Sequence, residues 1–145
     1  MTAPLVLAVS RVFETPAERL FDAWLDPAQA RRFLFATASG EVTRCEIDAR
    51  PGGGFTIVDR RGSEEAVHRG RYVEIERPRR IVFRFSAGGD SEADWSRVTI
   101  EIEPRGTGCD LRLTHELDPI WAEWEARTRH GWETILEALA RVTEG

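Results

Sequence analysis

Residues 120–143, IWAEWEARTRHGWETILEALARVT, decide how we expect the chain to fold. Large side chains recur there at every third or fourth position, which is the spacing of one face of an α-helix. This stripe consists of Trp121, Trp124, Thr128, Trp132, Ile135, Leu139 and Val142. At about 1.5 Å per residue, the segment would form a helix about 36 Å long. The end of the chain therefore predicts a long amphipathic helix that can cross a whole sheet.

Upstream of this helix, short segments of alternating polarity are divided by glycine and proline turns, which is typical of an antiparallel meander. The predicted strands cover residues 5–13, 42–49, 54–60, 66–76, 80–86, 95–103 and 109–117. Two short helices are expected after the first strand. Thr15-Pro16 and Asp26-Pro27 each place a capping side chain before a proline, so residues 16–25 and 27–33 are predicted to be helical. The pattern indicates the α+β class.

The long helix must bury its stripe against the concave face of the sheet, and Gly53, Gly54 and Gly70 permit the bends that curve the sheet. Alternation predicts which strand residues face inward. They are Phe55, Ile57, Ile81, Phe83, Phe85, Val98, Ile100, Ile102, Leu111 and Leu113. We call the space between these residues and the helix the chamber. Side chains can fill the chamber or leave a cavity, and the pattern leaves both outcomes open.

Charge and composition exclude several classes of partner. A net charge of -5 lacks the excess of cations that nucleic-acid binding requires, so no nucleic-acid partner is expected. No apolar run approaches the roughly 20 residues that span a bilayer, so no membrane partner is expected either. Cys45 and Cys109 lie outside any metal-binding spacing, and we expect neither a metal nor another cofactor. We expect one soluble, cytoplasmic domain over residues 1–145.

Several segments, taken in order, resemble one bacterial family. They are FETPAERLFDAWLDP (13–27), GGF (53–55), GRYVEI (70–75), RIVF (80–83), VTI (98–100), LTHE (113–116) and GW (131–132). The family consists of proteins similar to the heat-shock protein 90 ATPase activator, within the START-like and polyketide-cyclase-like (SRPBCC) superfamily. The resemblance covers nearly the entire chain. It implies a helix-grip fold, as in birch-pollen-allergen-like proteins, in which a curved seven-stranded antiparallel sheet surrounds a long C-terminal helix.

The resemblance also implies that the chamber holds apolar or aromatic molecules, as it does in many relatives. One departure limits this inference. Residues 32–35 are RFLF, where many relatives carry a tryptophan pair near the mouth of the cavity. The identity of a ligand therefore cannot be transferred from the family.

The residues that we expect to line a ligand cavity combine inward-facing strand positions with aromatic residues near the helices. They are Phe33, Phe35, Phe55, Ile57, Asp59, Phe83, Phe85, Val98, Ile100, Leu113, His115, Trp124, Thr128 and Trp132. His115 is either a general base or a structural hydrogen-bonding residue. Asp59 is either a chamber carboxylate with a raised pKa or a solvated residue at the end of a strand. Gly131 either admits an aromatic ring from the sheet or leaves room for a ligand.

Three functions fit this pattern. The first is binding or carriage of an apolar or aromatic small molecule without catalysis, because no nucleophile motif, phosphate-binding loop or metal spacing is present. The second, suggested by the family alone, is a co-chaperone-like module that stimulates a heat-shock protein 90 type ATPase. The third is a cyclase- or hydrolase-like enzyme that uses His115 or Asp59. A homodimer is compatible with all three.

Overall fold

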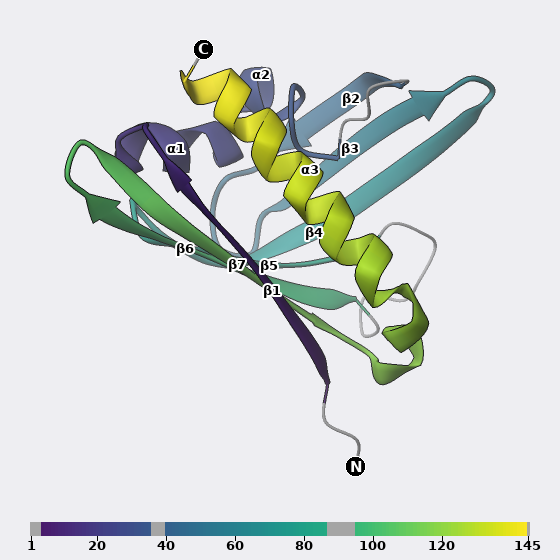
Figure 1. The fold of residues 1–145 in the computed structure, drawn as a ribbon. Helices are drawn as coiled ribbons and strands as arrows, with labels where there is room; N and C mark the ends of the chain where they lie inside the picture. Colours follow the sequence, from purple (N-terminus) through teal and green to yellow (C-terminus); the bar gives the residue numbers. More distant parts are fainter. Residues whose placement is uncertain (1–3, 36–39, 87–94, 145) are drawn as a thin grey trace.

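The computed structural model describes residues 4–35, 40–86 and 95–144 (Figure 1). Within these ranges, seven strands form one antiparallel sheet in the order β1-β7-β6-β5-β4-β3-β2. The strands are β1 (Leu5–Phe13), β2 (Glu41–Ile47), β3 (Gly54–Arg61), β4 (Glu64–Glu76), β5 (Arg80–Ser86), β6 (Ser96–Arg105) and β7 (Gly108–Leu117). The helices are α1 (Ala17–Leu25), α2 (Pro27–Ala30), the 3₁₀ helix η2 (Pro119–Trp124) and α3 (Glu125–Glu144). The predicted α+β, helix-grip fold is confirmed.

The sheet is a meander because successive strands from β2 to β7 are antiparallel neighbours. The first strand, β1, pairs with β7 and forms one edge of the sheet. Every strand bound predicted from alternation lies within two residues of the observed one. Figure 1 shows α3 lying diagonally across one face of the sheet, with α1 and α2 beside its C-terminal part. The inward-facing strand residues and the buried face of α3 form one hydrophobic core. That core occupies the predicted chamber.

The long helix begins later than the sequence predicted. Residues 119–124 form η2, and α3 starts at Glu125. Asp118 caps η2, because its side chain accepts a hydrogen bond from the backbone N–H of Ile120 at 3.0 Å, and Pro119 occupies the first position. The tighter 3₁₀ winding rotates side chains away from the 3.6-residue stripe. Trp121 and Trp124 are consequently 47% and 39% exposed, and the buried stripe begins at Trp132.

Of the two N-terminal caps predicted for the short helices, the structure has one. Asp26 caps α2 as predicted, since its carboxylate accepts from the backbone N–H of Ala28 at 3.0 Å, although α2 ends at Ala30. The cap predicted at Thr15 is wrong. Thr15 is buried, and its hydroxyl group lies 3.2 Å from that of Thr143 on α3. The tertiary contact with α3 takes the place of a local cap, and Pro16 stands at the cap position without a side-chain bond.

Arginine side chains cover a carbonyl group on each edge strand of the sheet. On β1, the carbonyl oxygen of Ala8 accepts a hydrogen bond from Arg129 of α3 at 2.7 Å. On β2, the carbonyl oxygen of Val42 accepts one from Arg31 at 2.8 Å, next to a register shift between Val42 and Arg44. Both strands end the sheet order, so these carbonyl groups have no strand partner on that side.

None of the helices in the described ranges combines the length and the apolar character that a membrane span requires.

Candidate functional site

The predicted cavity-lining residues lie mainly in the core between the sheet and α3. Twelve of the fourteen are buried there, and Trp124 and Thr128 are not. The buried ones are Phe33, Phe35, Phe55, Ile57, Asp59, Phe83, Phe85, Val98, Ile100, Leu113, His115 and Trp132. Their position between helix and sheet agrees with the sequence, whereas their role in binding a ligand stays a prediction. Trp124 belongs to η2, and the guanidinium carbon of Arg127 lies 4.6 Å from the centroid of its ring. Thr128 is half-buried.

Rings gather in one part of this core, and we call them the aromatic cluster. Its members are Phe35, Phe55, His68, Tyr72, Phe83, Phe85, His115 and Trp132. They come from β3, β4, β5, β7, α3 and the segment that follows α2. Neighbouring ring centroids are 4.1 to 6.3 Å apart, in stacked and edge-to-face arrangements. The sheet therefore presents a broad aromatic surface to α3.

Phe35 contacts more members of the cluster than its position in a connecting segment would suggest. Its ring lies parallel to the imidazole of His68, with centroids 4.1 Å apart and planes 4° apart. It also stacks on Phe55 and Phe85 and touches Trp132. Its backbone has φ 57°, in the left-handed region that side chains with a Cβ rarely adopt. This conformation directs the ring into the core.

Close approach within the cluster depends on Gly70 of β4, which pairs with Phe55 of β3. A Cβ atom at Gly70 would lie 2.0 Å from Cε2 of Phe55, so the phenyl ring uses the space that a side chain would occupy. Gly131 is different. A Cβ atom there would meet nothing within 4 Å, and the residue is exposed. The interpretation of Gly131 as a seat for a ring is therefore wrong, and its interpretation as room for a ligand stays a prediction.

His115 is the centre of a hydrogen-bonded chain between α3 and the sheet. Nε1 of Trp132 donates to Nδ1 of His115 at 3.0 Å, which assigns the ring proton to Nε2. Nε2 lies 2.8 Å from Oγ of Ser96 and donates to it, and the Ser96 hydroxyl donates to the carbonyl of Phe85 at 3.4 Å. Burial lowers the pKa of His115 to about 4. The imidazole is neutral and both of its nitrogen atoms are engaged, which favours the structural role.

Asp59 faces the core at the far end of β3 and is fully buried. Its Oδ2 accepts a hydrogen bond from Nε of Arg61 at 2.8 Å, and the Arg61 side chain is half exposed. The expectation of a solvated residue at the end of a strand is therefore wrong. The carboxylate stays buried because a guanidinium group from the same strand compensates its charge.

Two members of the cluster, His68 and Tyr72, are not among the lining residues predicted from the sequence. Both are buried, and burial lowers the pKa of His68 to about 4 and raises the pKa of Tyr72. The sequence did contain a signal for them, because His68, Gly70 and Tyr72 occupy every second position of β4 and therefore share one face of the strand. Arg69 and Arg71 lie between them on the opposite face, and together with the glutamates near the ends of β4 they make the strand look charged throughout. Considering every second residue of the strand would have identified both residues.

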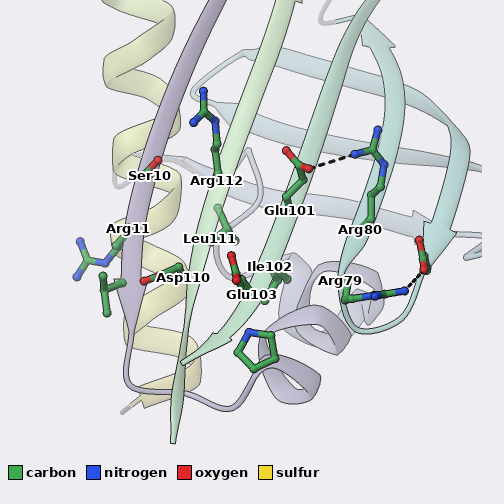
Figure 2. A pocket seen from close by; sticks show the side chains of 13 residues that line it. Ser10, Arg11, Arg79, Arg80, Glu101, Ile102, Glu103, Asp110, Leu111 and Arg112 are labelled. Carbon is green, nitrogen blue, oxygen red and sulfur yellow. Dashed lines mark hydrogen bonds and ion pairs between the residues drawn. The ribbon is translucent and has the colours of Figure 1, made fainter. Parts of the chain in front are cut away.

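A separate hollow lies on the opposite face of the sheet, over β1, β7, β6 and β5, with a volume of about 920 Å³ (Figure 2). Its floor carries cross-strand charges. Arg112, Glu101 and Arg80 lie on neighbouring strands in register, and Arg80 binds Glu101 at 3.2 Å. Arg79 pairs with Glu76 at the rim. Because opposite charges alternate and pair with one another, the hollow favours no class of charged ligand.

Metal binding finds no support in the described part of the chain, where no group of three or more histidine, cysteine, aspartate or glutamate residues is placed to hold an ion. The two cysteines are free thiols. Cys109 is buried, its Sγ donates to the carbonyl of Thr15 at 3.2 Å, and burial raises its pKa to about 11. It is therefore protonated at neutral pH and a weak nucleophile.

Comparison with solved structures supports the fold throughout the chain. A protein from Chromobacterium violaceum is 26% identical, with a TM-score of 0.86 and coverage of 98% of this chain and 99% of that one. An AHSA1-like protein from Aeromonas hydrophila is 22% identical, with a TM-score of 0.83 and coverage of 97% and 92%. A protein of unknown function from Staphylococcus aureus is 15% identical, with a TM-score of 0.84 and coverage of 97% and 94%.

No curated protein matches the chain. Residues 14–144, which include every helix and all strands after β1, match the family described as "Activator of Hsp90 ATPase homolog 1-like protein". The match agrees with the helix-grip architecture and with the segments that resembled this family in the sequence. The chain therefore belongs to the Activator of Hsp90 ATPase homolog 1-like family.

Proposed function

We propose that the protein binds or carries an apolar or aromatic small molecule between the sheet and α3. The observation that carries this proposal is the aromatic cluster, in which eight rings from six different parts of the fold meet beneath one helix. Rings offer a large apolar area at a low entropic cost and accept flat ligands on their faces. The family's fold typically encloses a ligand-binding cavity, which agrees with this proposal.

The arrangement of the chain's acidic and basic groups gives less support to catalysis. His115 donates and accepts through fixed partners, and Asp59 is held by Arg61. A general acid or base needs a position from which it reaches a substrate proton. We therefore treat both residues as structural parts of the binding core.

The proposal is tested on freshly purified protein. Native mass spectrometry reveals a retained ligand, and tryptophan fluorescence is titrated with fatty acids and aromatic polyketides. Trp132 lies in the cluster whereas Trp121 is half exposed on η2, so the two make a matched pair. We expect a saturable fluorescence change that W132F loses and W121F keeps. Protein that is empty in every preparation and unquenched by every probe would contradict the proposal.

A second candidate is a module that stimulates a chaperone ATPase. Its support is the family description together with an apolar surface on η2, where Ile120 is 74% exposed beside Trp121 and Trp124. Exposed large apolar residues of this kind often contact a protein partner. The test is the ATPase rate of the host's own chaperone with wild type and with a W121A/W124A double variant. An unchanged rate with wild-type protein would remove this candidate.

A further inference from the structure

Phe35 fills its place in the aromatic cluster under two unfavourable conditions. The first concerns its own backbone. Among the described residues, Phe35 is the one residue other than glycine with a positive φ, and Cβ atoms clash with the following carbonyl oxygen in that region. A phenylalanine stays there only when surrounding contacts hold it, and here they are ring contacts with His68, Phe55, Phe85 and Trp132.

The second condition concerns His68, on which the ring of Phe35 lies flat. His68 is 9% exposed, and its Nδ1 is buried with no hydrogen-bond partner. Buried polar atoms are nearly always satisfied, so an unsatisfied one requires an explanation. Burial keeps the imidazole neutral, so one of its nitrogen atoms carries the ring proton and the other a lone pair. Nδ1 therefore offers either a donor or an acceptor, and a hydroxyl group can pair with both.

Both conditions would be relieved together if another flat ring replaced Phe35. Phe35 would leave the left-handed region, and the imidazole would no longer be stacked against the ring of Phe35. The torsion about Cβ–Cγ of a histidine is broad, so a released ring can turn Nδ1 toward the vacated space. A hydroxyl group on the incoming ring would then satisfy Nδ1. A phenylalanine has no such group.

We infer that Phe35 is a plug in the ligand site, and that the ligand is a planar aromatic molecule with a hydroxyl group, which displaces Phe35 and forms a hydrogen bond with Nδ1 of His68. This inference rests on the proposed function and names its ligand class. The remaining walls of the site are Phe55, Phe85 and Trp132, whose rings already contact Phe35. Apolar faces bind the ring, and one polar atom selects the hydroxyl group.

The test uses two probes of nearly equal shape, 2-naphthol and 2-methylnaphthalene, of which only the first donates a hydrogen bond. Affinities are measured with wild type, F35A and H68F by quenching of Trp132, with native mass spectrometry as a second readout. We expect wild type to prefer 2-naphthol by about tenfold, which corresponds to one hydrogen bond. H68F should lose this preference and bind both probes alike.

F35A removes the plug, so it should bind both probes about tenfold more tightly, because wild type must first expel its own ring. F33A is the matched control. Phe33 is also buried, but it packs against Trp24 outside the cluster, so its removal should not tighten binding. Circular dichroism checks that each variant is folded. H68F keeps a flat ring at position 68 and tests the hydrogen bond even if F35A fails to fold.

The outcomes separate this inference from the proposed function. Fatty acids or aromatic molecules that quench Trp132 in wild type, without preference for 2-naphthol and without tightening in F35A, would overturn the plug and leave the binding function intact. Failure of wild type and F35A to bind any probe would overturn both. In the favourable case, the Nδ1 resonance of His68 in ¹⁵N spectra shifts with 2-naphthol and stays in place with 2-methylnaphthalene.

Discussion

The two ends of α3 pack against the rest of the molecule in different ways. Its C-terminal half buries Leu136, Leu139 and Val142, and both the hydroxyl and the carbonyl group of Thr143 there form hydrogen bonds. The hydroxyl of Thr143 donates to the carbonyl of Leu139, and Arg19 of α1 donates to the carbonyl of Thr143 at 3.2 Å. We call this part of the interface the closed end.

The N-terminal half of α3 contacts the aromatic cluster through one large residue, Trp132. None of the residues of η2 is buried, and burial in α3 begins at Trp132. The cluster also contains a left-handed residue, Phe35, and an unsatisfied buried atom, Nδ1 of His68. The difference teaches that one helix can serve two purposes. Its closed end provides stability, and its aromatic end keeps the strained features that the proposed ligand would relieve.

The largest expected effect of a single substitution separates the two ends by stability. Leu139 is fully buried at the closed end, so L139A should lower the free energy of unfolding by about 3 kcal/mol, as cavity-forming substitutions do. W124A, on exposed η2, should change it by no more than about 0.5 kcal/mol. Urea denaturation measures both, with E137A as a control on the exposed side of α3. Equal losses for L139A and W124A would show that the ends do not differ.

Acidic pH should weaken the aromatic end selectively. The pKa values of His68 and His115 are about 4 in the folded protein, against about 6.5 in the unfolded chain. The unfolded chain therefore binds more protons between these values, and stability falls as the pH drops from 6.5 to 4. Above pH 6.5 the contribution is complete, and below pH 4 these groups cause no further loss. The loss approaches about 3 kcal/mol for each histidine.

This prediction is measured by urea denaturation of wild type, H68F and H130Q at pH 7, 5.5 and 4.5. H68F should lose part of the pH dependence, because it removes one of the two buried imidazoles. His130 is exposed, and H130Q should behave like wild type. Hydrogen exchange should increase first in β4 and β7, which carry the two buried histidines. Hydrogen exchange that increases first at the closed end would contradict the prediction that acid weakens the aromatic end selectively.

Alanine substitutions at two glycines, Gly70 and Gly131, test how tightly the aromatic end is packed. G70A would force Phe55 to move, since the new Cβ would lie 2.0 Å from its ring, and we expect a loss of about 2 kcal/mol from overpacking. G131A on exposed α3 meets open space and should instead gain about 1 kcal/mol from helix propensity. Thermal unfolding measures both changes. A G70A protein as stable as wild type would mean that the cluster is loosely packed.

The smallest expected effect tests the hydrogen bonds of the closed end. T143V keeps the shape of the side chain but removes the partner of the Thr15 hydroxyl, so it should cost about 1 kcal/mol. The T15V/T143V double variant should cost less than the sum of the single variants, because it leaves no hydroxyl without a partner. Additive losses, measured by urea denaturation, would show that the two threonines do not interact.

The fold was predictable because its signals are local. Alternation placed all seven strands, and the stripe from Trp132 to Val142 identified the buried face of α3. Two features were missed, the first because it depends on a tertiary contact. Thr15 bonds to α3 rather than capping α1, and η2 takes Trp124 out of the stripe.

The candidate site was predictable only in part. The inward positions of β3, β5 and β7 follow from alternation, and the buried Phe35 was among the predicted lining residues. The left-handed backbone of Phe35 and its stacking on His68 were not predictable, because both depend on contacts between residues that are distant in the sequence. The charged residues on the outer face of β4 concealed His68. A site that depends on strained or unsatisfied groups is difficult to read from local preferences.

The arginine-covered carbonyl groups on the two edge strands bear on how the protein behaves at high concentration. An open sheet edge is a template on which a second molecule can add a strand, and such additions lead to aggregates and fibrils. Arg129 over Ala8 and Arg31 over Val42 each occupy an acceptor that an incoming strand would need. Self-association by sheet extension is therefore disfavoured at both ends of the meander.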